Sequence, residues 1–63
     1  MLIATYKAPN AKHYRLDRVE FHRDGHKLTA KLLNTHAGLA LTCESRAFVK
    51  RAEKLAVAYY HKI

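Results

Sequence analysis

The chain has 63 residues, which is too short for a dinucleotide-binding fold, a barrel enzyme or a two-domain cleft. Its 12 Lys and Arg residues outnumber its 5 Asp and Glu residues and give a net charge of +7 at pH 7. With 49% hydrophobic residues, two glycines and one proline, the composition is not that of a disordered or collagen-like chain. We therefore expect residues 1–63 to form a single small basic domain.

Cysteine usage and hydropathy indicate the cellular compartment. The one cysteine, Cys43, has no second thiol with which to form an internal disulfide, so the disulfide-stapled secreted miniproteins are excluded. Residues 1–7 lack the basic start and the long apolar stretch of a signal peptide. The longest apolar run, residues 55–60, is too short to span a bilayer. The sequence thus predicts a soluble cytoplasmic protein and no membrane contact.

Three segments alternate apolar and polar residues as half-buried strands do: residues 14–22, 26–33 and 38–43. A shorter segment, residues 2–6, is a candidate fourth strand at the N-terminus. The alternative for residues 27–37 is a short helix. We favour strands, because the two hairpins that they form place their apolar residues on the same face of one sheet.

Asp24-Gly25 lies between the first two alternating segments and is typical of a two-residue hairpin turn, in which both central residues take positive φ. This turn predicts that Phe21 lies opposite Leu28. A register shifted by one residue would put every apolar side chain on the opposite face. The pattern therefore predicts a two-residue turn rather than a three-residue turn.

A second hairpin is predicted, with residues 34–37 as its connection. Its register places Leu32 opposite Leu39, so that both hairpins share one apolar face. It also places Lys27 opposite Glu44, which is a favourable cross-strand charge pair.

The last segment, residues 45–61, has the periodicity of an amphipathic helix with Ser45 as its N-cap. We expect its apolar stripe to cover the sheet and bury Leu41. The stripe consists of Phe48, Ala52, Leu55 and Tyr59. The predicted fold class is α+β: a two-layer, three-stranded antiparallel sheet, with the candidate fourth N-terminal strand, packed by one C-terminal helix.

Catalytic and metal-binding patterns are weak. His22 and His26 have a spacing that suits metal ligands on a helix, but the predicted turn between them directs the two rings to opposite faces. Cys43 is predicted to face the core as a small apolar residue. The sequence contains no serine nucleophile elbow and no glycine-rich phosphate loop. We therefore expect no enzymatic activity, no metal and no cofactor.

Basic residues form the most informative pattern. The predicted helix carries a ladder at spacings of four residues: Arg46, Lys50 and Lys54. The outer face of the predicted sheet adds a secondary patch: Arg18, Lys27 and Lys31. We expect the helix ladder to be the main binding surface, because fewer acidic residues accompany it in the sequence. A basic connector at residues 7–15 includes Tyr14, which is able to stack on a base. Excess Lys and Arg on a small domain most often neutralise phosphate, although a purely solubilising surface is the simple alternative.

These patterns predict a small basic nucleic-acid-binding or regulatory module, with DNA favoured over RNA. The alternative is an inhibitor or adaptor of the phage or plasmid type that captures an acidic surface of a host protein. A homodimer is also indicated, because a core of this size is marginal and further apolar residues extend beyond the helical stripe. These residues are Val57, Tyr60 and Ile63.

In the order of its predicted elements, the segment 14–62 resembles the arm-binding domains of phage integrases and the plant AP2-type DNA-binding domains. Both families have a three-stranded sheet backed by one helix. The resemblance implies that the sheet lies in the major groove of DNA, and it concerns the order of elements alone.

Overall fold

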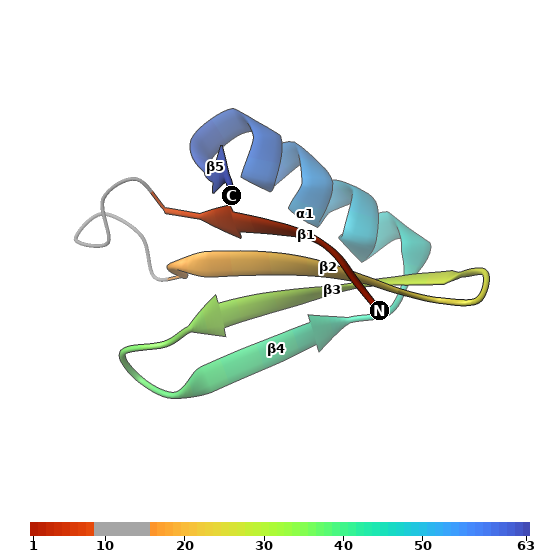
Figure 1. Ribbon diagram of the computed structural model, residues 1–63, viewed down its shortest axis with the longest axis horizontal. Coiled ribbons are helices and arrows are strands. Elements are labelled where there is room, and N and C mark those ends of the chain that lie inside the picture. The colour runs from red at the N-terminus through yellow and green to blue at the C-terminus, as the bar shows by residue number, and fades with distance from the viewer. Residues whose placement is uncertain (9–15) are drawn as a thin grey trace.

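The computed structural model describes residues 1–8 and 16–63 of the chain, which form a five-stranded antiparallel sheet with one helix packed against it (Figure 1). The elements are β1 (Leu2–Lys7), β2 (Arg18–Asp24), β3 (Lys27–Asn34), β4 (Leu39–Cys43), α1 (Arg46–Tyr59) and β5 (His61–Lys62). The strand order in the sheet is β4-β3-β2-β1-β5. The α+β class and the single C-terminal helix are confirmed, but the sheet has five strands rather than the three predicted.

The candidate N-terminal strand is present as β1, which pairs with β2 in the middle of the sheet. It contributes Tyr6 to the side that faces the helix, where the Tyr6 and Phe21 rings meet edge to face with their centroids 5.7 Å apart. This geometry is favourable for two aromatic rings. Pairing with β1 therefore makes β2 a central strand, which buries Val19 completely.

The strand β5 was not predicted, because two residues are too few to show any periodicity. The helix was predicted to reach residue 61 but ends at Tyr59, and the chain continues at Tyr60 in an extended conformation. His61 then pairs with Lys7, and the Ile63 N–H donates to the Thr5 carbonyl oxygen over 2.8 Å. The chain end thus adds a strand at the edge beside β1.

The first hairpin has a different register from the one predicted. Phe21 lies opposite Ala30 rather than Leu28, and the two turn residues are Gly25 and His26. Gly25 has a φ of +62°, and no non-glycine residue in the described segments has a positive φ. Positive φ at the first central residue alone is the pattern of a type II′ turn, whereas a turn at residues 24–25 of type I′ would also force Asp24 into that region. The shift is by two residues, so the predicted apolar face is preserved.

The second hairpin is shifted in the same way. Leu32 lies opposite Leu41 rather than Leu39, and the connection is residues 35–38, which end at Gly38 with a φ of +68°. Positive φ is costly for residues other than glycine, so the glycine fixes where this loop ends. The predicted ion pair is found, since Lys27 Nζ lies 3.6 Å from Glu44 Oε1, but the two residues are not directly opposite each other as predicted, because the register is shifted.

The helix begins as predicted, with the Phe48 N–H donating to Ser45 Oγ over 3.2 Å. Its buried side is displaced by one residue from the predicted stripe: Val49, Ala52 and Ala56 are buried within α1. Phe48 and Tyr59, which were predicted to lie in the core, are 55% and 58% exposed. The small alanine side chains let the helix pack closely on the sheet, where they join Val19 and Ala30 in one buried cluster, and larger side chains at these positions would hold the helix away.

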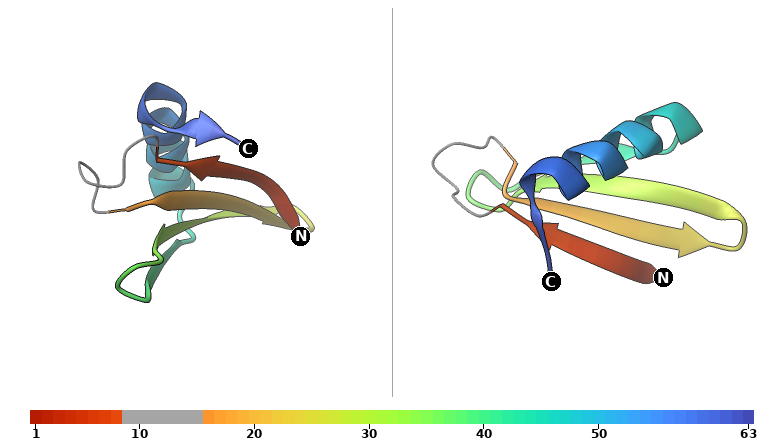
Figure 2. Two further views of the ribbon diagram at one scale, coloured as in Figure 1. Left: turned by 60° about the vertical axis from the view of Figure 1, so that its left-hand side comes forward. Right: turned by 90° about the horizontal axis from the view of Figure 1, so that it is seen from above.

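The helix contacts β3 and β5, and it leaves the edge strand β4 uncovered on the helix side (Figures 1 and 2). Leu41 is therefore 61% exposed, although it was predicted to be buried. Tyr60 is buried instead, and its hydroxyl donates to the Leu16 carbonyl oxygen over 2.7 Å. Tyr60 is thus part of the core and not of an apolar surface available for dimerisation.

Two predictions concern residues outside the described part of the chain: the start of the strand predicted at residue 14 and the basic connector with Tyr14. In the segments that the structure describes, no helix has the length and apolar character needed to cross a membrane.

Candidate nucleic-acid interface

Of the two faces of the sheet, one packs against α1 and the other is covered by no described element (Figure 2). Residues paired across an antiparallel ladder share a face. Because Tyr6 and Val19 are paired on the helix side, the neighbouring pair Lys7 and Arg18 must lie on the uncovered side. We call this surface the open face. Its polar and charged members are Thr5, Lys7, Arg18, Glu20, His22, Asp24, Lys27, Thr29, Lys31, Thr42 and His61.

Three cations cross the open face on three neighbouring strands. Lys7 on β1 lies opposite Arg18 on β2, and Lys31 on β3 lies opposite Glu20. Directly paired side chains are about 5 Å apart and diagonal neighbours about 7–8 Å apart. The three cations therefore form a row across the strands. The strand pairing fixes the distances between the backbone positions from which their side chains extend.

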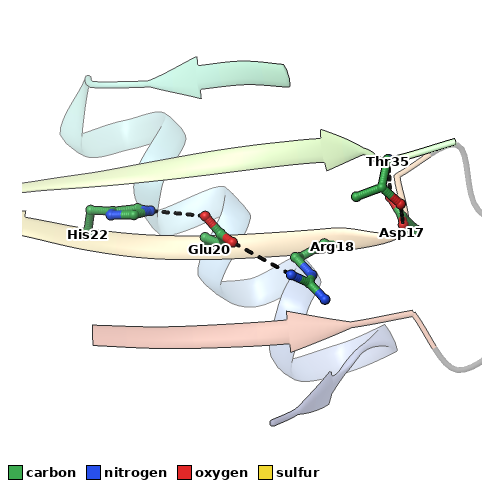
Figure 3. A network of polar contacts seen from close by, with 5 residues as sticks. All are labelled: Asp17, Arg18, Glu20, His22 and Thr35. Atoms are coloured by element: carbon green, nitrogen blue, oxygen red, sulfur yellow. Dashed lines mark hydrogen bonds and ion pairs between the residues drawn. The ribbon is translucent and has the colours of Figure 1, made fainter. Parts of the chain in front are cut away.

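Glu20 lies beside this row on β2, between Arg18 and His22, and contacts both of them (Figure 3). Its Oε1 lies 3.1 Å from His22 Nε2, and its Oε2 lies 4.0 Å from Arg18 Nη1. The Glu20 side chain is only 19% exposed, while that of Arg18 is 40% exposed. The carboxylate is thus held close to the sheet and orients its two neighbours, while the Arg18 guanidinium remains accessible to solvent.

Asp17 fixes the end of the sheet from which Arg18 projects (Figure 3). One Asp17 carboxylate oxygen accepts the Thr35 backbone N–H over 2.8 Å, and the other accepts the Thr35 hydroxyl. These hydrogen bonds, chiefly the one from the Thr35 hydroxyl, hold the pKa of Asp17 below its ordinary value of 3.8. The start of β2 is thereby tied to the loop between β3 and β4.

The predicted helix ladder is on the other side of the molecule. Its members, Arg46, Lys50 and Lys54, are all exposed on α1. Two acids, Glu44 and Glu53, line the same hollow as Arg46 and Lys50. The ladder therefore has more acidic neighbours than its sequence spacing indicated.

The six predicted site residues are thus divided between two surfaces. Arg18, Lys27 and Lys31 have the register positions of the open face, with Lys27 at its end beside the first hairpin turn, where it is paired with Glu44. The other three residues, Arg46, Lys50 and Lys54, lie on α1. Sequence reasoning did not place Lys7 on the sheet. The candidate strand at residues 2–6, which ends immediately before Lys7, was the signal that could have placed it on the sheet.

No protein-family model matches this chain, and no similar curated protein or solved structure is found. Across residues 1–8 and 16–63, no group of three or more His, Cys, Asp or Glu side chains is placed to hold a metal ion. The chemistry of the surfaces is therefore the basis for a functional proposal.

Proposed function

We propose that this protein is a small non-catalytic nucleic-acid-binding or regulatory module whose open face contacts the phosphates of a duplex. The observation that supports it is the row of Lys7, Arg18 and Lys31 across an uncovered sheet face in a chain of net charge +7. Lys and Arg bind phosphate by displacing the counterions that surround nucleic acid. The threonines beside the row supply hydroxyl groups of the kind that also bond to phosphate oxygens.

The composition of the open face favours a duplex over a single strand. Among the described residues, the aromatic side chains of the long strands, Tyr6 and Phe21, lie on the side that faces the helix. Proteins that bind single strands usually stack bases on exposed aromatic rings, and the open face offers none from the described residues. Strands can instead enter the major groove of B-form DNA, which is wider than that of A-form RNA. DNA is therefore favoured over RNA.

We rank the open face above the helix ladder for an electrostatic reason. Glu20 on the open face already bonds His22 and Arg18, and its side chain is largely covered. The acids beside the ladder, Glu44 and Glu53, share a hollow with its cations. The Glu44 side chain is 65% exposed even though it pairs with Lys27, and Glu53 is exposed as well, so both would repel an approaching phosphate. The ladder remains the second candidate surface.

An acidic surface of a host protein is the alternative partner. The observation that favours it is the number of large exposed hydrophobic side chains, since apolar contacts anchor protein interfaces. A pull-down from lysate with and without nuclease separates the two partner classes. A captured protein that persists after nuclease treatment favours the alternative, and its loss favours nucleic acid.

The direct test is fluorescence anisotropy with a labelled mixed-sequence DNA duplex, the corresponding single strand and polyglutamate. We expect the duplex to bind most tightly and polyglutamate, a polyanion without phosphate, to bind at least tenfold more weakly. Equal affinity for all three polymers would overturn the proposal, because it would show that the open face binds any polyanion and does not recognise the phosphates of a duplex.

A further inference from the structure

The edge strand β4 lacks the features that normally protect a sheet edge. Its five residues, Leu39–Cys43, include no charged side chain, whereas each of the other four strands contains at least one Lys or Arg. Exposed edges are usually blunted by Lys, Pro or a bulge, because their unpaired backbone groups invite another strand. The β3–β4 register runs without interruption, so no bulge turns β4 away from a second chain.

An apolar surface accompanies this edge on the helix side. Leu39 and Leu41 of β4 are 64% and 61% exposed, and Phe48 of α1 is 55% exposed. Leu41 and Phe48 line a shared groove between β4 and α1, together with Cys43 and Leu55. We call these five residues the β4 strip.

The core inside the chain is small compared with the apolar surface outside it. Of the nine buried hydrophobic residues among those described, four are alanines, whereas nine large hydrophobic residues are exposed. Chains of this length commonly need a disulfide, a metal or oligomerisation to supplement their core. Cys43 is a free thiol, so an internal disulfide does not fill this role.

We propose that two copies of the chain pair antiparallel through β4, which joins their sheets and buries both β4 strips. Residues paired in an antiparallel ladder share a face, so a symmetric pairing must be centred on a residue of the strand. Centred on Leu41, the pairing places Leu41 opposite Leu41 of the second copy and Leu39 opposite the second copy's Cys43. On the helix side of the strand, apolar residues then meet apolar residues, while Ala40 lies opposite Thr42 of the second copy on the open face.

The strip fits a second copy better than an unrelated protein. Apart from Arg51, whose guanidinium carbon lies 5.7 Å from the centre of the Phe48 ring, the groove is lined by uncharged residues. The groove therefore has few charged groups that could select a different protein through complementary charges. The molecule measures 35 Å and 20 Å along its longest and shortest axes. The side of the molecule that carries β4 therefore offers up to about 700 Å² in projection. A typical stable interface buries roughly 800 Å² on each partner, which is close to this value.

The dimer has a consequence that rests on the proposed function. The two-fold axis of an antiparallel strand pair is perpendicular to the sheet, so both helices lie on one side and both open faces on the other. Two rows of Lys7, Arg18 and Lys31 then face a single duplex. Such an arrangement suits a site with two-fold symmetry.

Sedimentation equilibrium across about 5 to 200 µM protein tests the dimer, since a reversible dimer has an apparent mass that rises with concentration and a tight dimer keeps twice the monomer mass throughout. The variant Leu41→Lys places a charge in the strip, and the matched control Thr42→Lys places the same charge on the opposite face of the same exposed strand. We expect wild type and Thr42→Lys to exceed the monomer mass of 7.3 kDa and approach twice that value. We expect Leu41→Lys to remain a monomer, with dimerisation weakened at least 100-fold and an unchanged circular dichroism spectrum.

A monomeric wild type over this range would overturn the proposal, and so would a dimer that survives Leu41→Lys. Cross-linking supplies a second readout in a Cys43→Ser background. Leu41→Cys should form a disulfide dimer at least tenfold faster than Thr42→Cys, because only the former lies opposite itself. Equal rates would contradict the pairing. Failure of the dimer is distinct from failure of the proposed function, since monomeric Leu41→Lys should still bind a duplex, only more weakly.

Discussion

Neutralising Lys31 should change how strongly duplex binding depends on salt. Each phosphate contact contributes about −0.9 to the slope of log affinity against log salt concentration on B-form DNA. With Lys7, Arg18 and Lys31 in contact, the slope per chain is about −2.7, so affinity should fall about 40-fold between about 50 and 200 mM KCl. In Lys31→Gln the slope should be about −1.8, and the same change in salt should cost only about 12-fold.

Fluorescence anisotropy at four or more salt concentrations measures both slopes. The variant should lose about a third of the wild-type slope whether one chain binds or two chains bind as a unit, because each chain then loses one of its three contacts. Lys54→Gln, which removes an exposed lysine from the helix, is the control and should leave the slope unchanged. An unchanged slope in Lys31→Gln, or a wild-type slope shallower than about −1, would refute the contact that we assign to the open face.

Two further predictions concern stability. Asp17→Asn should lower the free energy of unfolding at pH 7 by about 1 kcal/mol in urea titrations, a charge-assisted hydrogen-bond value reduced for solvent screening. The folded pKa of Asp17 lies below 3.8, so the stabilisation that Asp17 gives is present above that value and disappears as the pH falls through the folded pKa. The free energies of unfolding of wild type and variant should therefore converge in acid. A constant difference between them down to the lowest pH would contradict this. Val19→Ala removes two methyl groups from a fully buried site and should lower the free energy of unfolding by about 2–3 kcal/mol in the same titrations. This is a large part of the stability of so small a chain. A loss below about 0.5 kcal/mol would show that the site is not packed as described.

The sequence was sufficient to predict which face of the sheet each strand residue lies on, but not which residue lies opposite it on the neighbouring strand. Phe21 and Ala30 are predicted and found on the helix side, because alternation determines the face of each residue. Their partners were wrong by two residues, since Asp24-Gly25 suits more than one turn and alternation does not distinguish registers that differ by two. The backbone conformation at Gly25 decides between them, and it depends on the folded hairpin.

The helix shows a different limit. Its start was predictable from Ser45, whose hydroxyl is a standard N-cap. Its buried side was predicted only in part: Ala52 is buried as expected, but hydrophobicity favoured Phe48 and Tyr59 over Val49 and Ala56, which are actually buried. Close approach to the sheet selects the small residues, and the sequence alone does not give that distance.

The two basic surfaces, one on the sheet and one on the helix, were predictable from the sequence, but the neighbours that each surface acquires in the fold were not. Arg18 and Lys31 were assigned to the outer sheet face by their alternation, and they lie there. Lys7 joins them only because β1 pairs with β2, a long-range contact that no local pattern encodes. Glu44 and Glu53 come to lie beside Arg46 and Lys50 through tertiary packing as well.

The central claim, that the open face and not the helix binds the duplex, is tested most directly by comparing two double variants. Lys7→Gln with Lys31→Gln neutralises two exposed lysines of the open face, and Lys50→Gln with Lys54→Gln neutralises two exposed lysines of the helix. Both change the net charge equally, so any difference in affinity reports position and not total charge. We predict that in about 0.1 M KCl the open-face pair weakens duplex binding about 60-fold, the value of two lost phosphate contacts, while the helix pair weakens it less than twofold. A larger loss from the helix pair would contradict the assignment and move the interface to α1.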